Sequence, residues 1–435
     1  MFDAVLAWLK ELGMYKARGT QRTDSLAVRS PTRPLRRLEL VCDAIRVAVK
    51  TMVKADPAWT RSVIPAEWEQ KYGRPCKSER MSNEEREQKA AHVGRDGQWL
   101  LDRLEEEDAA RLRERRDVET FRLIWKQHYT RAEDGSLIWT PGGDHGGADA
   151  IETPYDPEAR WSTKRKQDWI GDKLQVTETD DEGYPHLITD IAITPAPESD
   201  MAALEAIRER QEAQNTLPSE RYVVSGYVSG ELLKDGRTNG EELLGPIRSV
   251  ATAQSKLPNG LTHKDFQIDL ISGQVICPAG IEVFLTNGGH DSRQATFPAK
   301  LCQTCPLHER CCTGKKEGRS VRFGPHYEET QELRQRQQTE RFKENYRAHR
   351  GGVEACLSAL MRGPGQRTTR HVGRRNNHTT RAVRWRGGES CALRGVSCRL
   401  PAQRTPGAAW VGGREREKCG ADGSCGLLMV ANPGF

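Results

Sequence analysis

Apolar residues recur at helical spacing in the first part of the chain. Within residues 1–17 they share one face of a predicted amphipathic helix, formed by Phe2, Val5, Leu6, Leu9 and Leu12. Residues 35–54 repeat this spacing and predict a second helix. Residues 80–131 are rich in Glu, Arg and Lys, and their alternating charge predicts exposed helices. Between the first two helices, residues 22–28 predict a short extended stretch that carries Asp24.

After residue 155 the apolar residues alternate at period two. Residues 171–179 and 186–194 follow this pattern around a turn-like segment, which predicts a β-hairpin. Residues 200–213 predict a helix. Upstream, residues 140–150 form a linker dense in glycine, and because no Lys-Ser/Thr pair follows, its glycines do not form a phosphate loop.

Strand and helix patterns continue to alternate towards the end of the chain. Residues 221–227 predict an apolar strand that stops at Gly226, and a helix begins near residue 231. Residues 243–247 predict a further short strand, and residues 328–362 predict a long helix. When the helical region that follows the first strand (residues 31–150) is left out, the order of elements is β, ββ, α, β, α, β, α. It resembles an RNase H-like core, an α/β fold in which helices cover a mixed sheet.

These patterns predict six regions. They are a helix with the first core strand (1–30), a helical insert (31–150), the RNase H-like core (151–255), a Cys-rich insert (256–325), a last helical region (326–378) and a basic tail (379–435). The tail has no helical or strand period and is rich in Arg, Gly, Ala, Pro and Cys. That composition predicts a frameshift near His378, and the alternative is a disordered basic tail.

Composition narrows the functional class. Hydrophobic residues make up 36% of the chain and the mean hydropathy is -0.74. There is no apolar run of about 18 residues and no signal peptide, so we expect a cytoplasmic protein without a membrane partner. The net charge of +6 is small, but basic residues cluster, and clustering favours a polyanion such as DNA. For any single cluster, the alternative is a solvated surface.

Two acidic residues are candidates for metal-dependent chemistry. Cleavage of a phosphodiester at neutral pH is efficient when two divalent ions activate a water and stabilise the leaving oxygen. Mg²⁺ or Mn²⁺ prefers carboxylate ligands. Asp24 lies on the first predicted strand and Glu354 on the last predicted helix, and an RNase H-like core would bring them together.

The sequence segments around these two residues resemble those of a known family. KARGTQRTDS, which contains Asp24, resembles the first catalytic strand of DDE transposases of bacterial insertion sequences. RYVVSGYVSGELL is similar to their fourth strand, and FKENYRAHRGGVEACLSALMRG to the helix that bears the catalytic glutamate. The resemblance implies Mg²⁺-dependent DNA cleavage and strand transfer at terminal inverted repeats and target DNA by a homo-oligomer. It also implies that Asp24 and Glu354 bind the metal.

The chain departs from the family pattern in ways that predict a degenerate copy. Val224 stands where the family has its middle Asp, before Ser225 and Gly226, and a valine cannot bind a cation. Asp200 is a candidate for a substitute carboxylate. Asp172 stands where the family usually has Tyr. Few residues precede Asp24, so the start is predicted to be truncated, and we expect severe loss of activity.

Basic residues in this resemblance imply contacts to DNA phosphates. They are Arg160, Lys164, Arg165, Lys166, Lys173, Arg367 and Arg370. Trp161 and Trp169 lie beside the first four, and each either stacks on an unpaired base or packs in the core.

Five of the twelve cysteines crowd one short region. In a cytosolic chain they are not expected to form disulfides, and a CxxC pair with two further thiols is compatible with tetrahedral Zn²⁺. The family's spacing implies Cys277, Cys302, Cys305 and Cys311 as the zinc ligands. Cys312 is then spare, and His308 is an alternative ligand. Reduced structural cysteines are the competing interpretation.

Two rival functions remain open at this stage. One is a non-catalytic DNA-binding protein derived from a transposase, which Val224 favours. The other is a zinc-binding interaction protein, which rests on the cysteines alone.

Overall fold

The computed structural model describes residues 2–140, 147–164, 166–247, 252–289, 291–312, 314, 318–362, 368 and 372–374. Arg165, Arg367, Arg370, most of the glycine linker and the tail 379–435 therefore lie outside the described residues. The predictions made for them stay predictions.

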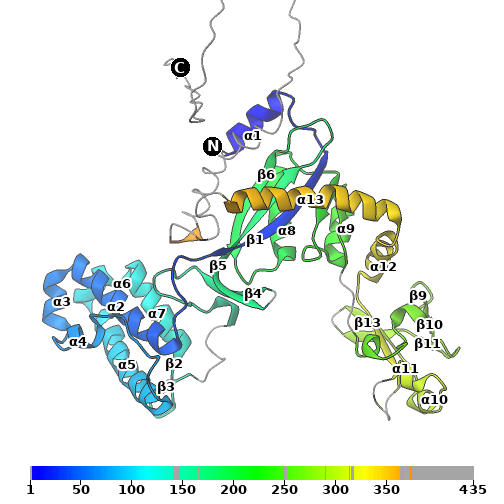
Figure 1. Ribbon diagram of the computed structural model, residues 1–435. Helices are drawn as coiled ribbons and strands as arrows, with labels where there is room; N and C mark the ends of the chain where they lie inside the picture. The colour runs from blue at the N-terminus through cyan, green and yellow to red at the C-terminus, as the bar shows by residue number, and fades with distance from the viewer. Residues whose placement is uncertain are drawn as a thin grey trace, which may run out of the picture. The chain divides into compact units, whose positions relative to one another are not determined.

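A mixed sheet of six strands organises the centre of the chain (Figure 1). Its strands are β1 (Thr20–Arg29), β4 (Arg160–Lys164), β5 (Gln167–Thr179), β6 (Ile188–Pro195), β7 (Glu220–Val223) and β8 (Glu242–Leu244). β1 pairs antiparallel with β5 on one side and parallel with β7 on the other, and β8 continues the parallel side. β4 and β6 pair with successive parts of β5. The predicted α/β class, mixed sheet and hairpin are thus confirmed.

Four helices accompany the sheet. They are α8 (Asp200–Ala213), α9 (Gly230–Thr238), α12 (Tyr327–Arg336) and α13 (Glu340–Arg362). The prediction of one helix over 328–362 was wrong, because the hydroxyl of Thr339 accepts the backbone N–H of Phe342 and starts a separate helix. The predicted strand 221–227 was too long, since the chain turns where Tyr227 N–H donates to Val224 O.

The first helix is also shorter than its pattern predicted. α1 spans Phe2–Glu11 instead of residues 1–17. Gly13 has a φ of 69°, and the N–H of Met14 donates to the carbonyl of Leu9. A left-handed glycine with this backward hydrogen bond is a common helix terminator.

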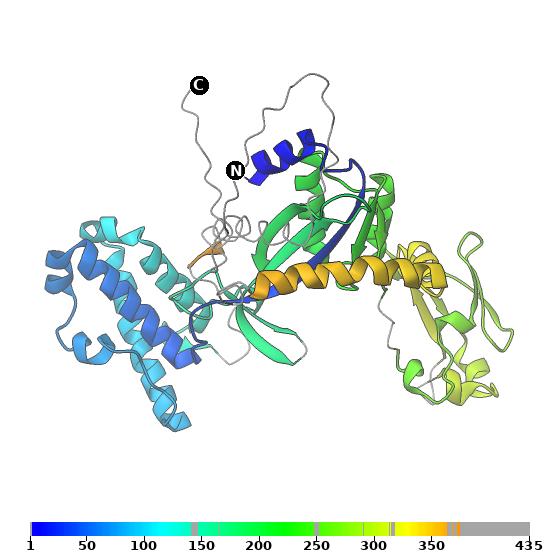
Figure 2. The same ribbon diagram turned by 45° about the horizontal axis from the view of Figure 1, so that its top comes forward.

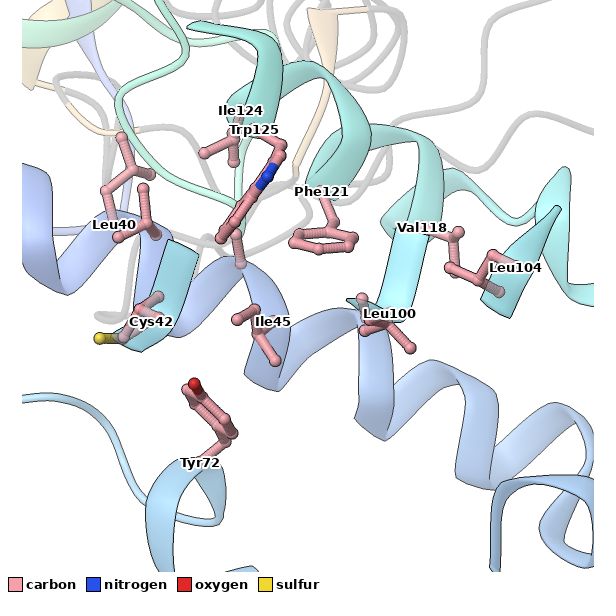
Figure 3. Packing of buried hydrophobic residues seen from close by; sticks show 14 of the residues in the cluster. Leu40, Cys42, Ile45, Tyr72, Leu100, Leu104, Val118, Phe121, Ile124 and Trp125 are labelled. Atoms are coloured by element: carbon pink, nitrogen blue, oxygen red, sulfur yellow. The ribbon is translucent and has the colours of Figure 1, made fainter. Parts of the chain in front are cut away.

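The N-terminal helical region has its own apolar core. Its helices are α2 (Arg37–Ala55), α3 (Pro57–Val63), α4 (Trp68–Tyr72), α5 (Asn83–Leu104), α6 (Ala110–Arg113) and α7 (Arg116–His128), with a short hairpin of β2 (Tyr129–Arg131) and β3 (Leu137–Trp139). Figure 3 shows Ile45 of α2 beside Phe121 and Trp125 of α7. The expectation that residues 80–131 form exposed helices was wrong, because their charges occupy only the outer face while Leu100 and Phe121 are fully buried.

The cysteine-rich region, residues 256–325, is built from small sheets and is called the Cys module below. One sheet contains β9 (Gln267–Asp269), β10 (Gln274–Ile276) and β11 (Glu282–Phe284). The other contains β12 (Thr286–Gly289), β13 (Ser292–Thr296) and β14 (Ser320–Phe323), with the short helices α10 (Ala299–Gln303) and α11 (His308–Cys311) nearby in sequence. Val275, Phe297 and Phe323 form its small core.

α13 runs across β1, which both ribbon views show (Figures 1 and 2). Arg22 of β1 forms ion pairs with Glu178 at 2.6 Å and Asp180 at 2.8 Å, and it donates to the carbonyl of His349 at 3.2 Å. A Cβ on Gly352 would collide with the Arg22 guanidinium, so a larger residue at this position would have to displace the arginine from its ion pairs.

Candidate functional site

An open cleft lies where β1 extends beyond β7. The last residue pair between these strands is Thr23 with Val223, so the following residue, Asp24, stands beside an uncovered strand edge. The cleft has a volume of about 660 Å³. We call it the carboxylate cleft, and its lining includes Asp24, Ser25, Lys164, Trp169, Asp200, Val224, Gly226, Arg350 and Glu354.

α13 brings Glu354 to the same cleft as Asp24, as the sequence predicted. Arg350, one helical turn before Glu354, joins the two: its Nη2 lies 3.2 Å from Oδ2 of Asp24 and 2.9 Å from Oε1 of Glu354. The Asp24 side chain is only 10% exposed, whereas that of Glu354 is 69% exposed. Two carboxylates thus share one positive charge. Sequence reasoning missed Arg350, although its i,i+4 spacing to Glu354 was a usable signal.

Val224 stands in the turn after β7 and lines the cleft. It is half-buried and packs against the apolar cluster that contains Val223, Leu232 and Leu333. Position 224 therefore presents an apolar side chain to this wall of the cleft.

Asp200, the first residue of α8, adds a third carboxylate to the cleft. Its Oδ1 accepts a hydrogen bond from Ser25 Oγ at 3.2 Å and lies 3.4 Å from Lys173 Nζ. Lys173 also donates to the carbonyl of Glu198 at 2.5 Å. The backbone N–H of Ser25 donates to Asp24 Oδ1 at 2.7 Å. A single residue therefore touches both aspartates.

Burial raises the pKa of the Asp24 carboxyl above its ordinary value. The Ser25 N–H and the charges of Arg350 and Lys164 act in the opposite direction, and the negative charge of Asp200 adds to the rise in pKa. Asp24 and Asp200 are thus close enough to influence each other's charge.

The residues predicted to bind DNA differ in their surroundings. Lys164 and Lys166 are exposed at the β4–β5 hairpin, and Lys164 reaches the carboxylate cleft. Arg160 is half-buried and donates to the carbonyls of Pro157 and Ala159, and Lys173 is held by Asp200. The two tryptophans separate: Trp161 is 49% exposed, whereas Trp169 is 8% exposed and packs in the wall of the cleft.

The predicted zinc ligands line one cavity of about 20 Å³ in the Cys module, together with Cys312 and His308. Three of the sulfurs accept backbone N–H donors at 3.4 Å: Cys277 from Ile281, Cys302 from Arg319 and Cys305 from Leu307. Burial raises the pKa of the Cys311 thiol, and it raises the pKa of Cys312 to about 12. Cys312 lines the same cavity as Cys302 and Cys311, so it belongs to the cluster.

Both places have donors of a suitable kind for the ions that the sequence predicts. Carboxylate oxygens suit Mg²⁺ and thiolates suit Zn²⁺. In the cleft, the Arg350 guanidinium already lies where a cation can interact with Asp24 and Glu354 together. Within the described ranges, no three His, Cys, Asp or Glu side chains converge closely enough on one point to hold an ion.

Comparison with known proteins supports the family resemblance. Residues 276–384 match the family described as Transposase DDE domain, roughly a quarter of the chain, and this segment includes Glu354 and the four predicted zinc ligands. The resemblance to DDE transposases of the insertion-sequence type is thus confirmed, and it supports a transposase-type function. No curated protein and no solved structure matches the chain. Among the helices described, none has the length and apolar character needed to cross a membrane.

Proposed function

We propose that this chain is a DDE transposase that cuts DNA at the ends of an insertion sequence and joins it to target DNA. The observation that carries this proposal is the meeting of Asp24 and Glu354 at Arg350 in one open cleft. The matched transposase segment contains Glu354 but not Asp24, so the geometry links the match to the first strand.

The proposed core is RNase H-like. The strand order β6–β5–β1–β7–β8, antiparallel on one side of β1 and parallel on the other, supports it. In this proposal residues 31–150 and 256–325 are inserts between core elements, and residues 1–30, 151–255 and 326–378 form the core.

Asp24 and Glu354 would hold Mg²⁺ or Mn²⁺, which when bound activates a water and stabilises the leaving oxygen. The chain's own residues would bind and orient the DNA. Lys164 and Lys166 at the β4–β5 hairpin would contact phosphates, and the exposed ring of Trp161 could stack on an unpaired base.

Val224 supports the further proposal that this copy is impaired. Its isopropyl group supplies no ligand oxygen, and its packing against apolar neighbours leaves a carboxylate missing beside Asp24. The same observation favours the second candidate function, a protein that binds transposon ends without cutting them.

A nicking assay tests both candidates. The substrate is a supercoiled plasmid that carries the DNA flanking the gene, incubated with the full chain and Mn²⁺. We expect slow nicking by the wild type and faster nicking by Val224→Asp. Val224→Asn introduces a side chain with the shape of Asp but without its charge, so it should not gain activity. Adding Asp24→Asn to Val224→Asp should remove the gain. Binding of the flanking DNA without nicking by any variant would contradict the transposase proposal and support the DNA-binding alternative.

The Cys module is proposed to bind one structural Zn²⁺ through Cys277, Cys302, Cys305 and Cys311. The backbone N–H donors to three of these sulfurs support thiolate ligands, because such donors stabilise negative charge on sulfur. Cys312 is a competitor of Cys311 for the fourth position, since it contacts both Cys302 and Cys311.

A further inference from the structure

We propose that Asp200 supplies the carboxylate that Val224 cannot, so that Asp24, Asp200 and Glu354 together bind a divalent cation in the cleft. This inference rests on the proposed function and adds a ligand to its site. It assigns a metal-binding role to the first residue of a helix that follows the β5–β6 hairpin, away from β7 in the sequence.

The contacts of Ser25 tie Asp200 to the site. The Ser25 backbone N–H donates to Asp24, and its hydroxyl donates to Asp200 Oδ1. The second oxygen of Asp200 faces the turn after β7, where a Cβ on Gly226 would lie only 2.6 Å from Oδ2. No described residue donates a hydrogen bond to Oδ2. Glycine at position 226 thus leaves room for a carboxylate oxygen beside Val224.

The chain's own cations explain why the three carboxylates do not converge on one point. Lys173 holds Asp200, while Arg350 holds Asp24 and Glu354. An incoming ion must compete with these ammonium and guanidinium groups for the carboxylates. Removing Lys173 should therefore strengthen metal binding if Asp200 is a ligand.

A second feature of the cleft points to a bound ligand. Trp169 lines the cleft and is only 8% exposed, and its Nε1 has no acceptor among the described residues. Buried N–H groups are rarely left without an acceptor. A metal-bound phosphodiester would offer acceptor oxygens to this donor and a cation to the carboxylates.

The competing interpretation is that Asp200 is only structural. An acidic residue in the first turn of a helix is stabilised by the helix dipole, and the ion pair with Lys173 satisfies it. That role predicts that changes at Asp200 alter the stability of the fold but not the affinity for metal ions.

The test measures Mn²⁺ binding to the full chain by electron paramagnetic resonance, without DNA. We expect Asp200→Asn to weaken binding by about tenfold or more, and we expect the same of Asp24→Asn. Glu205→Gln is the matched control, because Glu205 is an exposed carboxylate on the same helix. Circular dichroism and thermal unfolding of each variant separate loss of a ligand from loss of fold.

Two lysine variants sharpen the result. Lys173→Gln removes the charge that holds Asp200, whereas Lys164→Gln removes a charge from the same cleft that does not contact Asp200. We expect Mn²⁺ binding to strengthen more in Lys173→Gln than in Lys164→Gln. Equal effects of the two lysine variants would overturn the role of Asp200.

Unchanged Mn²⁺ affinity in Asp200→Asn, or no Mn²⁺ binding by the wild type, would also overturn the inference. Binding of the flanking DNA in EDTA is measured in parallel. If the chain binds and nicks the flanking DNA while Asp200→Asn leaves Mn²⁺ affinity unchanged, this inference fails and the proposed function stands. If neither DNA nor Mn²⁺ binds, both fail.

Discussion

The carboxylate cleft and the Cys module are two predicted metal sites. They differ in what surrounds the candidate ligand groups: cationic side chains in the cleft and mostly apolar surroundings in the Cys module. In the cleft, Asp24, Asp200 and Glu354 each have a cationic partner from the chain, either Arg350 or Lys173. In the Cys module, the thiols line a far smaller cavity, and burial raises the pKa of Cys311 and Cys312.

With the proposed zinc bound, this difference would separate a site that folds without a metal from one that depends on it. Ion pairs hold the cleft residues in place before any ion arrives, so metal binding there should change chemistry more than fold. The Cys module has a small core, and its cysteines come from separate segments of the chain, so metal binding there should contribute to folding itself.

The largest expected effect is loss of zinc from the Cys module. Removal of zinc by a chelator should leave residues 256–325 open to protease while the sheet of the core stays protected, because structural zinc contributes about 10 kcal/mol or more in small zinc domains. Metal analysis and limited proteolysis measure this. Cys302→Ser should lose zinc, whereas Cys356→Ser, a cysteine of α13 outside the cluster, should keep it. A zinc-free chain with a protected module would contradict the prediction.

A smaller effect is expected from Arg350→Met. This change leaves the Asp24 carboxylate buried without its cationic partner, which should cost about 1–3 kcal/mol in the free energy of unfolding. Urea denaturation measures the cost. Arg347→Met on the same helix is the control, since Arg347 is exposed and should change stability by less than about 0.5 kcal/mol. Equal costs for the two variants would show that the cleft does not rely on its own cation.

The smallest expected effect has the opposite sign. Burial raises the pKa of Asp24 on folding, so the folded state becomes less stable as pH rises from the ordinary Asp pKa to the raised one. Asp24→Asn should therefore stabilise the chain at neutral pH by about 0.5–2 kcal/mol, as removal of strained functional groups often does. The gain should vanish in acid, where Asp24 is protonated. Thermal unfolding at several pH values tests this, with Asp235→Asn as control, because Asp235 is exposed on α9 and lies outside the cleft lining.

The sequence predicted more of the elements than of their ends and contacts. The hairpin and α8 followed directly from period two and helical spacing, because both patterns are local. The break before α13 depends on one Thr339 hydroxyl, and the end of β7 on one turn hydrogen bond, so neither alters the apolar pattern.

The candidate site could be predicted where short sequence motifs identify its residues. It could not be predicted where it depends on contacts between residues far apart in the sequence. Asp24, Glu354 and Val224 were found from their neighbours in sequence. The ion pairs of Arg350 with Asp24 and of Lys173 with Asp200 join separate elements, and no local pattern predicts them. The division between exposed Trp161 and buried Trp169 likewise depends on how β4 and β5 pack.

The close contact between Arg22 and Gly352 joins β1 and α13, the two elements that carry the candidate carboxylates Asp24 and Glu354. Arg22 lies two residues before Asp24 on β1, and Gly352 lies two residues before Glu354 on α13. Because the buried guanidinium already forms ion pairs with Glu178 and Asp180, a larger residue at position 352 would have to displace it from them. A substitution at position 352 would therefore disturb how α13 packs on β1 without touching either carboxylate.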